Sequence, residues 1–260
     1  MQRSYLLAKL PVARLEAHGI GRGKEMLETH GFSITSAHYS RMGQQECEKI
    51  HMATLEILER VGVDVHDEKA RALLVKGGAK ADGVRVRIPE HMVAKALAVT
   101  PKQITLYNRH GKVAIRAWGY NTYYGGGSDC LNILDHRTNM RRRATLQDVK
   151  EATVLQDAHP EIDFVMSQFL PEDVDQRIYD RYQMEIMLNN TTKPIVFVAP
   201  DFEGCARVVE MCEIVAGGAE AFQRRPFAIC YINVTSGLVA NAEALQKCMY
   251  LEEKGLPQLY

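Results

Sequence analysis

Three apolar segments recur in the second half of the chain: DFVMSQF at residues 163–169, PIVFVAP at 194–200 and FAICYINV at 227–234. An amphipathic stretch with the apolar spacing of a helix follows each segment, and PQLY at 257–260 begins the pattern again. Successive segments start 31, 33 and 30 residues apart. Apolar strands that alternate with amphipathic helices are typical of a parallel sheet covered by helices.

A regular repeat near 30 residues without a glycine-rich phosphate fingerprint favours a (β/α)8 TIM barrel over a Rossmann sheet. Eight such units need about 250 residues, and only three complete units follow residue 160. The chain ends four residues into a strand, at Tyr260. We therefore predict an α/β fold with an incomplete barrel, and we expect the chain to be the N-terminal part of a longer protein.

The sequence before this repeat predicts two further parts. Residues 1–40 are expected to be a poorly patterned extension, because glycines interrupt every helical candidate. Residues 41–115 predict a small N-terminal α/β cap, with one helix that Gly62 ends and a second that Asp67 caps. The remaining residues, 116–260, are assigned to the first half of the barrel.

Composition and charge narrow the function classes. The chain is 46% hydrophobic and 25% charged, and 32 basic residues balance 32 acidic ones, whereas a nucleic-acid binder usually has a basic excess. We found neither an apolar run of membrane-spanning length nor a signal peptide, so the expected location is cytoplasmic, with no nucleic-acid or membrane partner. The six cysteines are scattered without metal-ligand spacing, which predicts reduced, mostly buried thiols and no metal site.

The segment YYGGGSDC at 123–130 is the most unusual part of the sequence. Its three glycines allow a close backbone approach or a sharp turn, and tyrosines precede them while a serine and an aspartate follow. Aromatic faces beside a carboxylate suit a cationic ligand. A hairpin turn with an aspartate cap and packed tyrosines explains the same pattern equally well.

Function in a parallel barrel sits at the carboxyl ends of the strands, which adds two positions to this segment. The candidate substrate-binding residues are Tyr124, Gly126, Gly127, Ser128, Asp129, Gln168 and Tyr231. A structural role in a loop is an equal alternative for the strand-end positions. The basic run Arg141–Arg143 is interpreted as a solvated loop before a helix that Thr145 caps, with an anion or protein contact as the alternative.

Several motifs, in order from Ser40 to Tyr260, resemble the trimethylamine methyltransferase superfamily, in the branch related to glycine betaine–corrinoid methyltransferases. The motifs that carry the resemblance are IHMATLEILERVGVDV, VRVRIPEHMVAKALAVTP, ITLYNRHG, YYGGGSDCLNILDHRTNMRRRATLQDV, LNNTTKPIVF and IVAGGAEAFQRRPFAICYINVTSGL. The GGGSD loop departs from the more usual FGTGS-like form, which leaves its ligand contact open.

The resemblance implies a TIM barrel that moves a methyl group from a methylated amine to the Co(I) corrinoid, a cobalamin-type cofactor, of a partner protein. The methyl donor would be trimethylamine or a quaternary amine such as glycine betaine. No cofactor would be bound tightly by this chain, its catalytic residues would lie in the missing C-terminal half, and the full-length protein would be a homo-oligomer. The alternative is an inactive half-barrel that serves as an interaction module or is a gene remnant.

Overall fold

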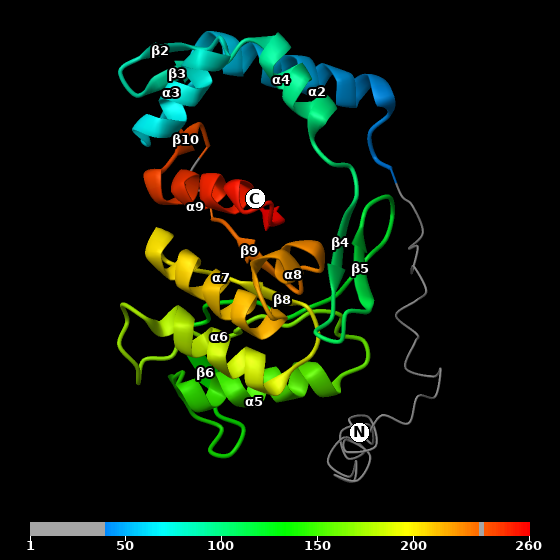
Figure 1. Cartoon of the computed structure of the whole chain (residues 1–260), viewed down its shortest axis with the longest axis vertical. Helices are drawn as coiled ribbons and strands as arrows, with labels where there is room; N and C mark the ends of the chain where they lie inside the picture. Colours follow the sequence, from blue (N-terminus) through cyan, green and yellow to red (C-terminus); the bar gives the residue numbers. More distant parts are fainter. Residues whose placement is uncertain (1–39, 234–236) are drawn as a thin grey trace.

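The computed structural model describes residues 40–233 and 237–260, so the predicted extension at 1–40 lies outside this part of the chain apart from Ser40 (Figure 1). Within the described ranges, no helix is both long and apolar enough to cross a bilayer. All six cysteines are free thiols; Cys205, Cys212 and Cys230 are buried, whereas Cys47 and Cys130 are exposed. The expectation of mostly buried thiols therefore holds for three of the six.

A parallel sheet forms in the second half of the chain, as the apolar segments predict. It contains β8 (Ile195–Phe197), β9 (Ala228–Tyr231) and β11 (Gln258–Leu259) in the order β8-β9-β11, which is also their order along the chain. Ile195 pairs with Ala228 and Gln258 pairs with Cys230, both in parallel register. Over the residues that the structure describes, the fold is mixed α/β and the sheets do not close into a barrel.

The segment 163–169 differs from the continuous strand that its apolar sequence predicts. Only single bridges form: Val165 pairs in parallel with Ile195 of β8, while Phe164 and Phe169 pair with the glycine-rich segment 125–130. The reason is a side chain. Gln156 accepts a hydrogen bond from the Met166 N–H at 3.2 Å and donates one to its carbonyl oxygen at 3.1 Å, so those backbone groups are unavailable for a strand ladder.

Helices follow the parallel segments and pack one beside the next. They are α5 (Leu146–Ala158), α6 (Tyr179–Asn190), α7 (Phe202–Ala216), α8 (Ala219–Arg224) and α9 (Ala242–Glu253). Figure 1 shows α5, α6, α7 and α9 as a stack on one side of the sheet. Val165, Ile195 and Cys230 point to this side and join the main core, because alternate residues of a strand face opposite sides of a sheet.

The opposite face of the sheet is covered by a hairpin rather than by helices. Its strands are β4 (Ile104–Tyr107) and β5 (Val113–Ala117). Leu106 and Ile115 of the hairpin pack against Met166, Val196 and Ile229 of the parallel segments in a second core. The sheet is therefore buried on both faces, which accounts for the apolar sequence of its strands.

The predicted N-terminal elements are present as a separate layer at the top of Figure 1. They are α2 (Gln44–Glu56), the π-helical turn Ile57–Val61, β1 (Val63–Val65), α3 (Glu68–Gly77), β2 (Lys80–Asp82), β3 (Arg85–Arg87) and α4 (Glu90–Val99). As predicted, Gly62 ends the first helix, with φ at 81°, and Asp67 caps α3 by accepting the Ala70 N–H. β10 (Val239–Ala240), which precedes α9, pairs in parallel with β1 and joins this layer to the rest.

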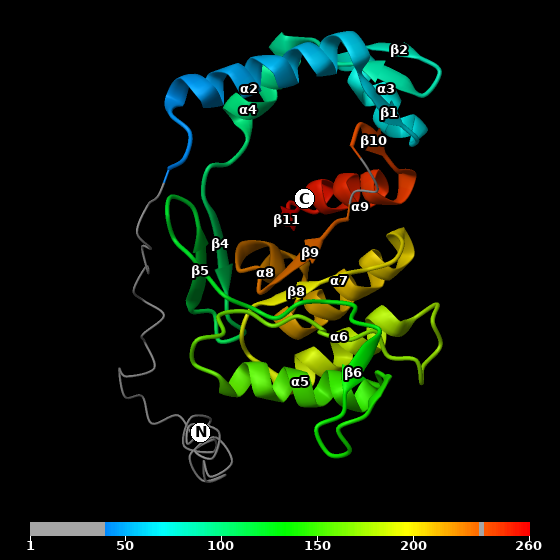
Figure 2. The ribbon, with the colours of Figure 1, turned by 180° about the vertical axis from the view of Figure 1, so that it is seen from behind.

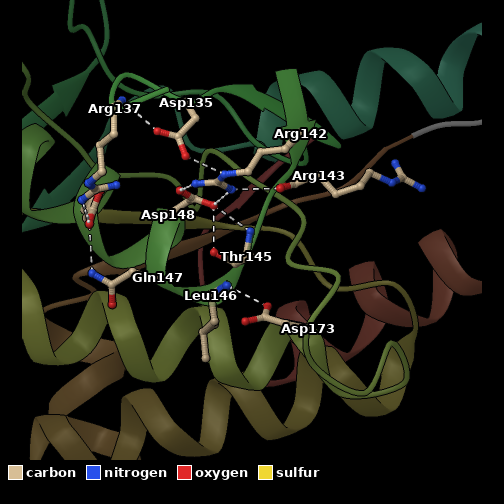
Figure 3. A network of polar contacts seen from close by, with 10 residues as sticks. Asp135, Arg137, Arg142, Arg143, Thr145, Leu146, Gln147, Asp148 and Asp173 are labelled. Atoms are coloured by element: carbon tan, nitrogen blue, oxygen red, sulfur yellow. Dashed lines mark hydrogen bonds and ion pairs between the residues drawn. The ribbon is translucent and has the colours of Figure 1, made fainter. Parts of the chain in front are cut away.

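The basic run Arg141–Arg143 forms strand β7, which pairs with β6 (Asn132–Leu134), so its interpretation as a loop is wrong. Figure 2 shows β6 beside α5. The Arg142 guanidinium holds both oxygens of Asp148, at 2.7 and 2.8 Å, and its Nε lies 2.8 Å from Asp135 (Figure 3). Thr145 precedes α5, as predicted, and Asp148 also accepts hydrogen bonds from the Thr145 N–H and hydroxyl, both at 2.8 Å, so one carboxylate joins the hairpin to the start of α5.

We expect Asp148→Asn to lower the free energy of unfolding at neutral pH by about 1–2 kcal/mol, because the hydrogen bonds to the charged carboxylate are lost. The Arg142 guanidinium lowers the pKa of Asp148 to about 2. This stabilisation is therefore present above the ordinary pKa of an aspartate and is lost as the pH falls through about 2. Denaturant unfolding at several pH values measures it. The exposed Asp82→Asn variant is the control, and an Asp148→Asn variant as stable as wild type at neutral pH would contradict the prediction.

Candidate functional site

The glycine-rich segment and the segment after α5 end side by side. Asp129 and Gln168 both have left-handed backbone conformations, with φ at 59° and 62°, although neither is glycine. Such conformations are disfavoured for residues with side chains and concentrate at functional sites. The two parallel segments thus place two conformationally unusual polar residues at the same edge of the sheet, which is the edge where the sequence predicts function.

The first two glycines of the segment make room for neighbouring side chains. A Cβ atom on Gly125 would overlap the ring of Phe164, and one on Gly126 would overlap the amide oxygen of Gln156. Gly127 has no neighbour within 4 Å of the corresponding position. The absence of a side chain at Gly126 therefore lets Gln156 lie between the two parallel segments. At Gly127 there is room for a side chain, so packing does not require a glycine there.

Gln168 is hydrogen-bonded to the glycine-rich segment, with which the sequence analysis predicts that it shares a site. Its N–H donates to the Gly127 carbonyl at 2.9 Å, and its side-chain oxygen accepts the Gly127 N–H at 3.2 Å. The Gln168 carbonyl also accepts the Cys130 N–H at 3.0 Å. The structure therefore brings Gly126, Gly127 and Gln168 together and fixes the backbone that carries Ser128 and Asp129.

One oxygen of the Asp129 carboxylate, at this edge, lacks a hydrogen-bond partner among the residues described. Its Oδ1 is buried and receives no hydrogen bond within the described residues. Burial raises the pKa of Asp129, and a hydrogen bond with the Gln183 side chain opposes part of that rise. Gln183 is itself buried on α6 and donates to the Phe169 carbonyl at 2.7 Å. A buried oxygen without a donor is the feature that a cationic ligand would satisfy.

Tyr179 is the aromatic residue whose ionisation is linked to Asp129. Burial raises the pKa of Tyr179 to about 12, and the charges of Asp129, Asp180 and Asp201 contribute to that rise. The phenol therefore keeps its proton at neutral pH and can donate a hydrogen bond. Sequence reasoning missed Tyr179 and Gln183; their position in the first turns of the helix that follows Gln168 was the available signal.

The tyrosines that the sequence proposed lie differently. Tyr124 is 59% exposed, and its backbone N–H donates to Asp163 at 2.8 Å. Tyr123 accepts the Arg116 N–H at its hydroxyl and packs, like Tyr231, against the core under the β4–β5 hairpin. Tyr231 is therefore at its strand end but partly buried, and the structure does not gather Tyr123 and Tyr124 around Asp129.

A cavity of about 360 Å³ adjoins the site between α5 and the β6–β7 hairpin. Gln156, Gln168 and Phe169 line this cavity together with Ile133 and His136. Among residues 40–233 and 237–260, no three histidines, cysteines or acids are grouped so that they could hold a metal ion. The site offers carboxylate, phenol and amide groups, which can bind a small cation without a metal.

Comparison with known proteins shows which family this arrangement belongs to. The family model for trimethylamine methyltransferase (MTTB) matches residues 16–259, which extends the resemblance beyond Ser40 toward the N-terminus. The chain belongs to the trimethylamine methyltransferase family. Membership accounts for the order in which the motifs occur along the chain.

Among the relatives is the trimethylamine methyltransferase MttB of Desulfitobacterium hafniense, 27% identical over 259 residues that cover 99% of this chain and 48% of that protein. The match to the glycine betaine methyltransferase of D. hafniense strain Y51 is 25% identical and covers 84% of this chain and 45% of that protein. The match to the MttB of Methanosarcina thermophila is 26% identical and covers 82% of this chain and 46% of that protein. The chain thus spans about half the length of the curated relatives it matches.

Gly126→Ala and Gly127→Ala form a matched pair of variants. The added methyl at Gly126 would collide with Gln156, whereas the one at Gly127 points into open space. We expect Gly126→Ala to lower the free energy of unfolding by about 1–3 kcal/mol through overpacking, and Gly127→Ala to change it little. Thermal and denaturant unfolding of both variants test this. Equal effects would show that Gln156 does not occupy the gap.

Proposed function

We propose that this chain is part of a methyltransferase that moves a methyl group from a methylated amine to the Co(I) corrinoid of a partner protein. The observation that carries the proposal is the buried, unpartnered oxygen of Asp129, in a member of this family, at the edge where the parallel segments end. Substrates named for the relatives, trimethylamine and glycine betaine, define the chemical class of donor.

The fold proposal is that the parallel segments belong to a (β/α)8 barrel. Segments 125–130 and 164–169, then β8, β9 and β11, lie side by side in chain order with parallel bridges. Their connecting helices pack in the same order on one side. Sequential parallel neighbours with outer helices are the construction rule of that barrel. The other strands would come from sequence that the relatives have and this chain does not align with.

The chemistry that the residues would supply is binding and orientation. A quaternary nitrogen has no proton and no lone pair, so it is recognised by a nearby negative charge and by aromatic surfaces. Asp129 supplies the charge, and its rigid position on the loop fixed by Gln168 would hold the methyl group in line. In such a transfer the carbon–nitrogen bond would break with its electron pair on the amine, and the reduced corrinoid, as the acceptor, would supply both electrons of its bond to the methyl group.

The corrinoid in this proposal is the methyl acceptor, and a separate protein carries it. The carboxyl edge of the sheet, with Asp129 and Gln168, is where that acceptor would approach. A homo-oligomeric full-length protein also belongs to this proposal. In an inactive interaction module, the competing hypothesis, the buried carboxylate of Asp129 would bind no amine.

The experiment combines the full-length protein containing this chain, a methylated amine and Co(I) cobalamin or a reduced corrinoid protein, and follows the spectrum of the cobalt. We expect methylation of cobalt only when protein, amine and reduced corrinoid are all present. Asp129→Asn should reduce kcat/KM by about tenfold or more, because the charge that binds the cation is lost. Its unfolding transition should change little.

Asp82→Asn is the matched control, since Asp82 is an exposed aspartate of β2. Methyl transfer without a corrinoid, or from S-adenosylmethionine, would contradict the assignment. Unchanged kinetics and unchanged amine affinity in Asp129→Asn would make Asp129 a turn residue, as the alternative interpretation of the sequence holds.

A further inference from the structure

Two buried thiols face each other in the main core, one from a helix and one from a strand. Cys205 lies in α7 and Cys230 in β9, and each is 0% exposed. Their Sγ atoms are 4.0 Å apart, in a weak hydrogen bond between thiols. Both are free thiols in this structure. The proposed methyl transfer uses neither side chain, so it leaves this pair without a role.

The separation of the two sulfur atoms is short enough for a covalent bond to close it. A disulfide has an S–S distance of about 2.0 Å, so the two sulfurs need to approach each other by about 2 Å. Because they are already in contact, the bond requires only a small adjustment of the two side chains and of α7 against β9. Both residues belong to the same packed core, which holds them in this position.

A buried cation contributes to the surroundings of the pair. Lys247 of α9 is 6% exposed, and its ammonium donates to the Ala199 carbonyl at 2.7 Å. The hydrogen bond with Cys230 lowers the pKa of Cys205, burial opposes that change, and the charge of Lys247 adds to the lowering. Cys205 is therefore the thiol of the pair that loses its proton more readily, and the thiolate is the reactive form of cysteine.

Another buried thiol of α7 is placed differently. Cys212 is as buried as Cys205 but lies seven residues further along the helix, which is about 10 Å along the axis. That is too far for a disulfide between the two. Burial also raises the pKa of Cys212, so it keeps its proton. Cys212 thus shares the helix and the burial of Cys205 but not its contact with Cys230, which makes it a matched control.

We propose that Cys205 and Cys230 form a redox modification site, which a hydroperoxide oxidises to a disulfide that ties α7 to β9. In the first step the Cys205 thiolate attacks a peroxide oxygen, the O–O bond breaks, and the leaving hydroxide takes up the thiol proton to give water. The Cys230 thiol then attacks the sulfur of the resulting sulfenic acid, the S–O bond breaks, and a second water leaves. Two thiols and one hydrogen peroxide thus give one disulfide and two waters.

Burial decides which oxidant reaches the pair. Neither residue has exposed surface, so an oxidant has to enter through transient openings of the core. Hydrogen peroxide is small and neutral and passes through such openings. Glutathione disulfide is a large charged molecule that has to place a sulfur against the attacking thiolate, so the folded core excludes it. The exposed thiols Cys47 and Cys130 are accessible to both oxidants.

The test treats the folded full-length protein with hydrogen peroxide, blocks the remaining thiols by alkylation and maps the disulfides by mass spectrometry after trypsin digestion. Trypsin cleaves after lysine and arginine, so cleavage at Arg207 and Arg224 places Cys205, Cys212 and Cys230 in three different peptides. We expect the Cys205 and Cys230 peptides to be linked, two hydrogens lighter than their sum, and to separate with dithiothreitol. The linked protein should melt about 5 °C or more above the reduced protein, because the cross-link constrains the unfolded chain.

Two variants and a second oxidant complete the test. Cys230→Ala removes one sulfur of the pair, so it should abolish both the linked peptides and the rise in melting temperature. Cys212→Ala removes a sulfur of equal burial outside the pair and should keep both. Glutathione disulfide should modify Cys47 and Cys130 in the folded protein without linking the pair.

Cys205 and Cys230 peptides that stay unlinked after peroxide, or a link from Cys205 to Cys212 or Cys248, would overturn the proposal. A link that forms only in denatured protein would also overturn it, because the contact in the folded core would then not be the cause. Linkage by glutathione disulfide as fast as by peroxide would overturn the role of burial. The peptide map of the wild-type protein requires no variant, so it decides even if Cys230→Ala does not fold. None of these outcomes affects the proposed methyl transfer.

Discussion

The insertion of Gln156 between two backbone segments determines the geometry of the whole carboxyl edge. Its amide group satisfies both the N–H and the carbonyl of Met166, as a neighbouring strand would otherwise do. The adjacent segment must therefore move away at that point, and Gly126 lets it do so. The bridges at Phe164 and Phe169 resume pairing on either side. The loop that carries Asp129 follows directly, held on one side by the space that Gly126 leaves for Gln156 and on the other by the bonds of Gln168 to Gly127.

The elements that could be predicted from the sequence were those with local causes. Helical spacing, the Asp67 cap, the glycine that ends the first helix and Thr145 at the start of α5 all depend on residues a few positions apart. The prediction of a continuous strand at 163–169 was wrong because the strand is interrupted by Gln156, a residue on the preceding helix. The interpretation of Arg141–Arg143 as a solvated loop was wrong because Arg142 is bound by two acids, Asp135 and Asp148, that lie on either side of the run in the sequence. A sequence pattern does not show when a side chain from another segment forms hydrogen bonds with the residues of a predicted element.

The site was predicted in part for the same reason. Consecutive residues such as Gly126, Gly127 and Asp129 could be recognised as a unit, and Gln168 followed from the rule for strand ends. Gln183 reaches this edge from α6, where it donates to the Phe169 carbonyl, and the charge of Asp129 acts on Tyr179 at the start of the same helix. Aromatic residues near in sequence were an unreliable guide, since Tyr124 is turned to solvent and Tyr123 is anchored to Arg116. Burial and the loss of hydrogen-bond partners, which decide the electrostatics, are properties of the assembled fold.

The pairing of β10 with β1 has a mechanical consequence. β10 lies between β9 and α9 in the chain, yet its hydrogen bonds belong to the sheet of the N-terminal layer. A displacement of that layer would therefore be transmitted through β10 to α9, which packs on α7 in the helical layer. A protein that docks on the N-terminal layer would act on the helical layer by this route.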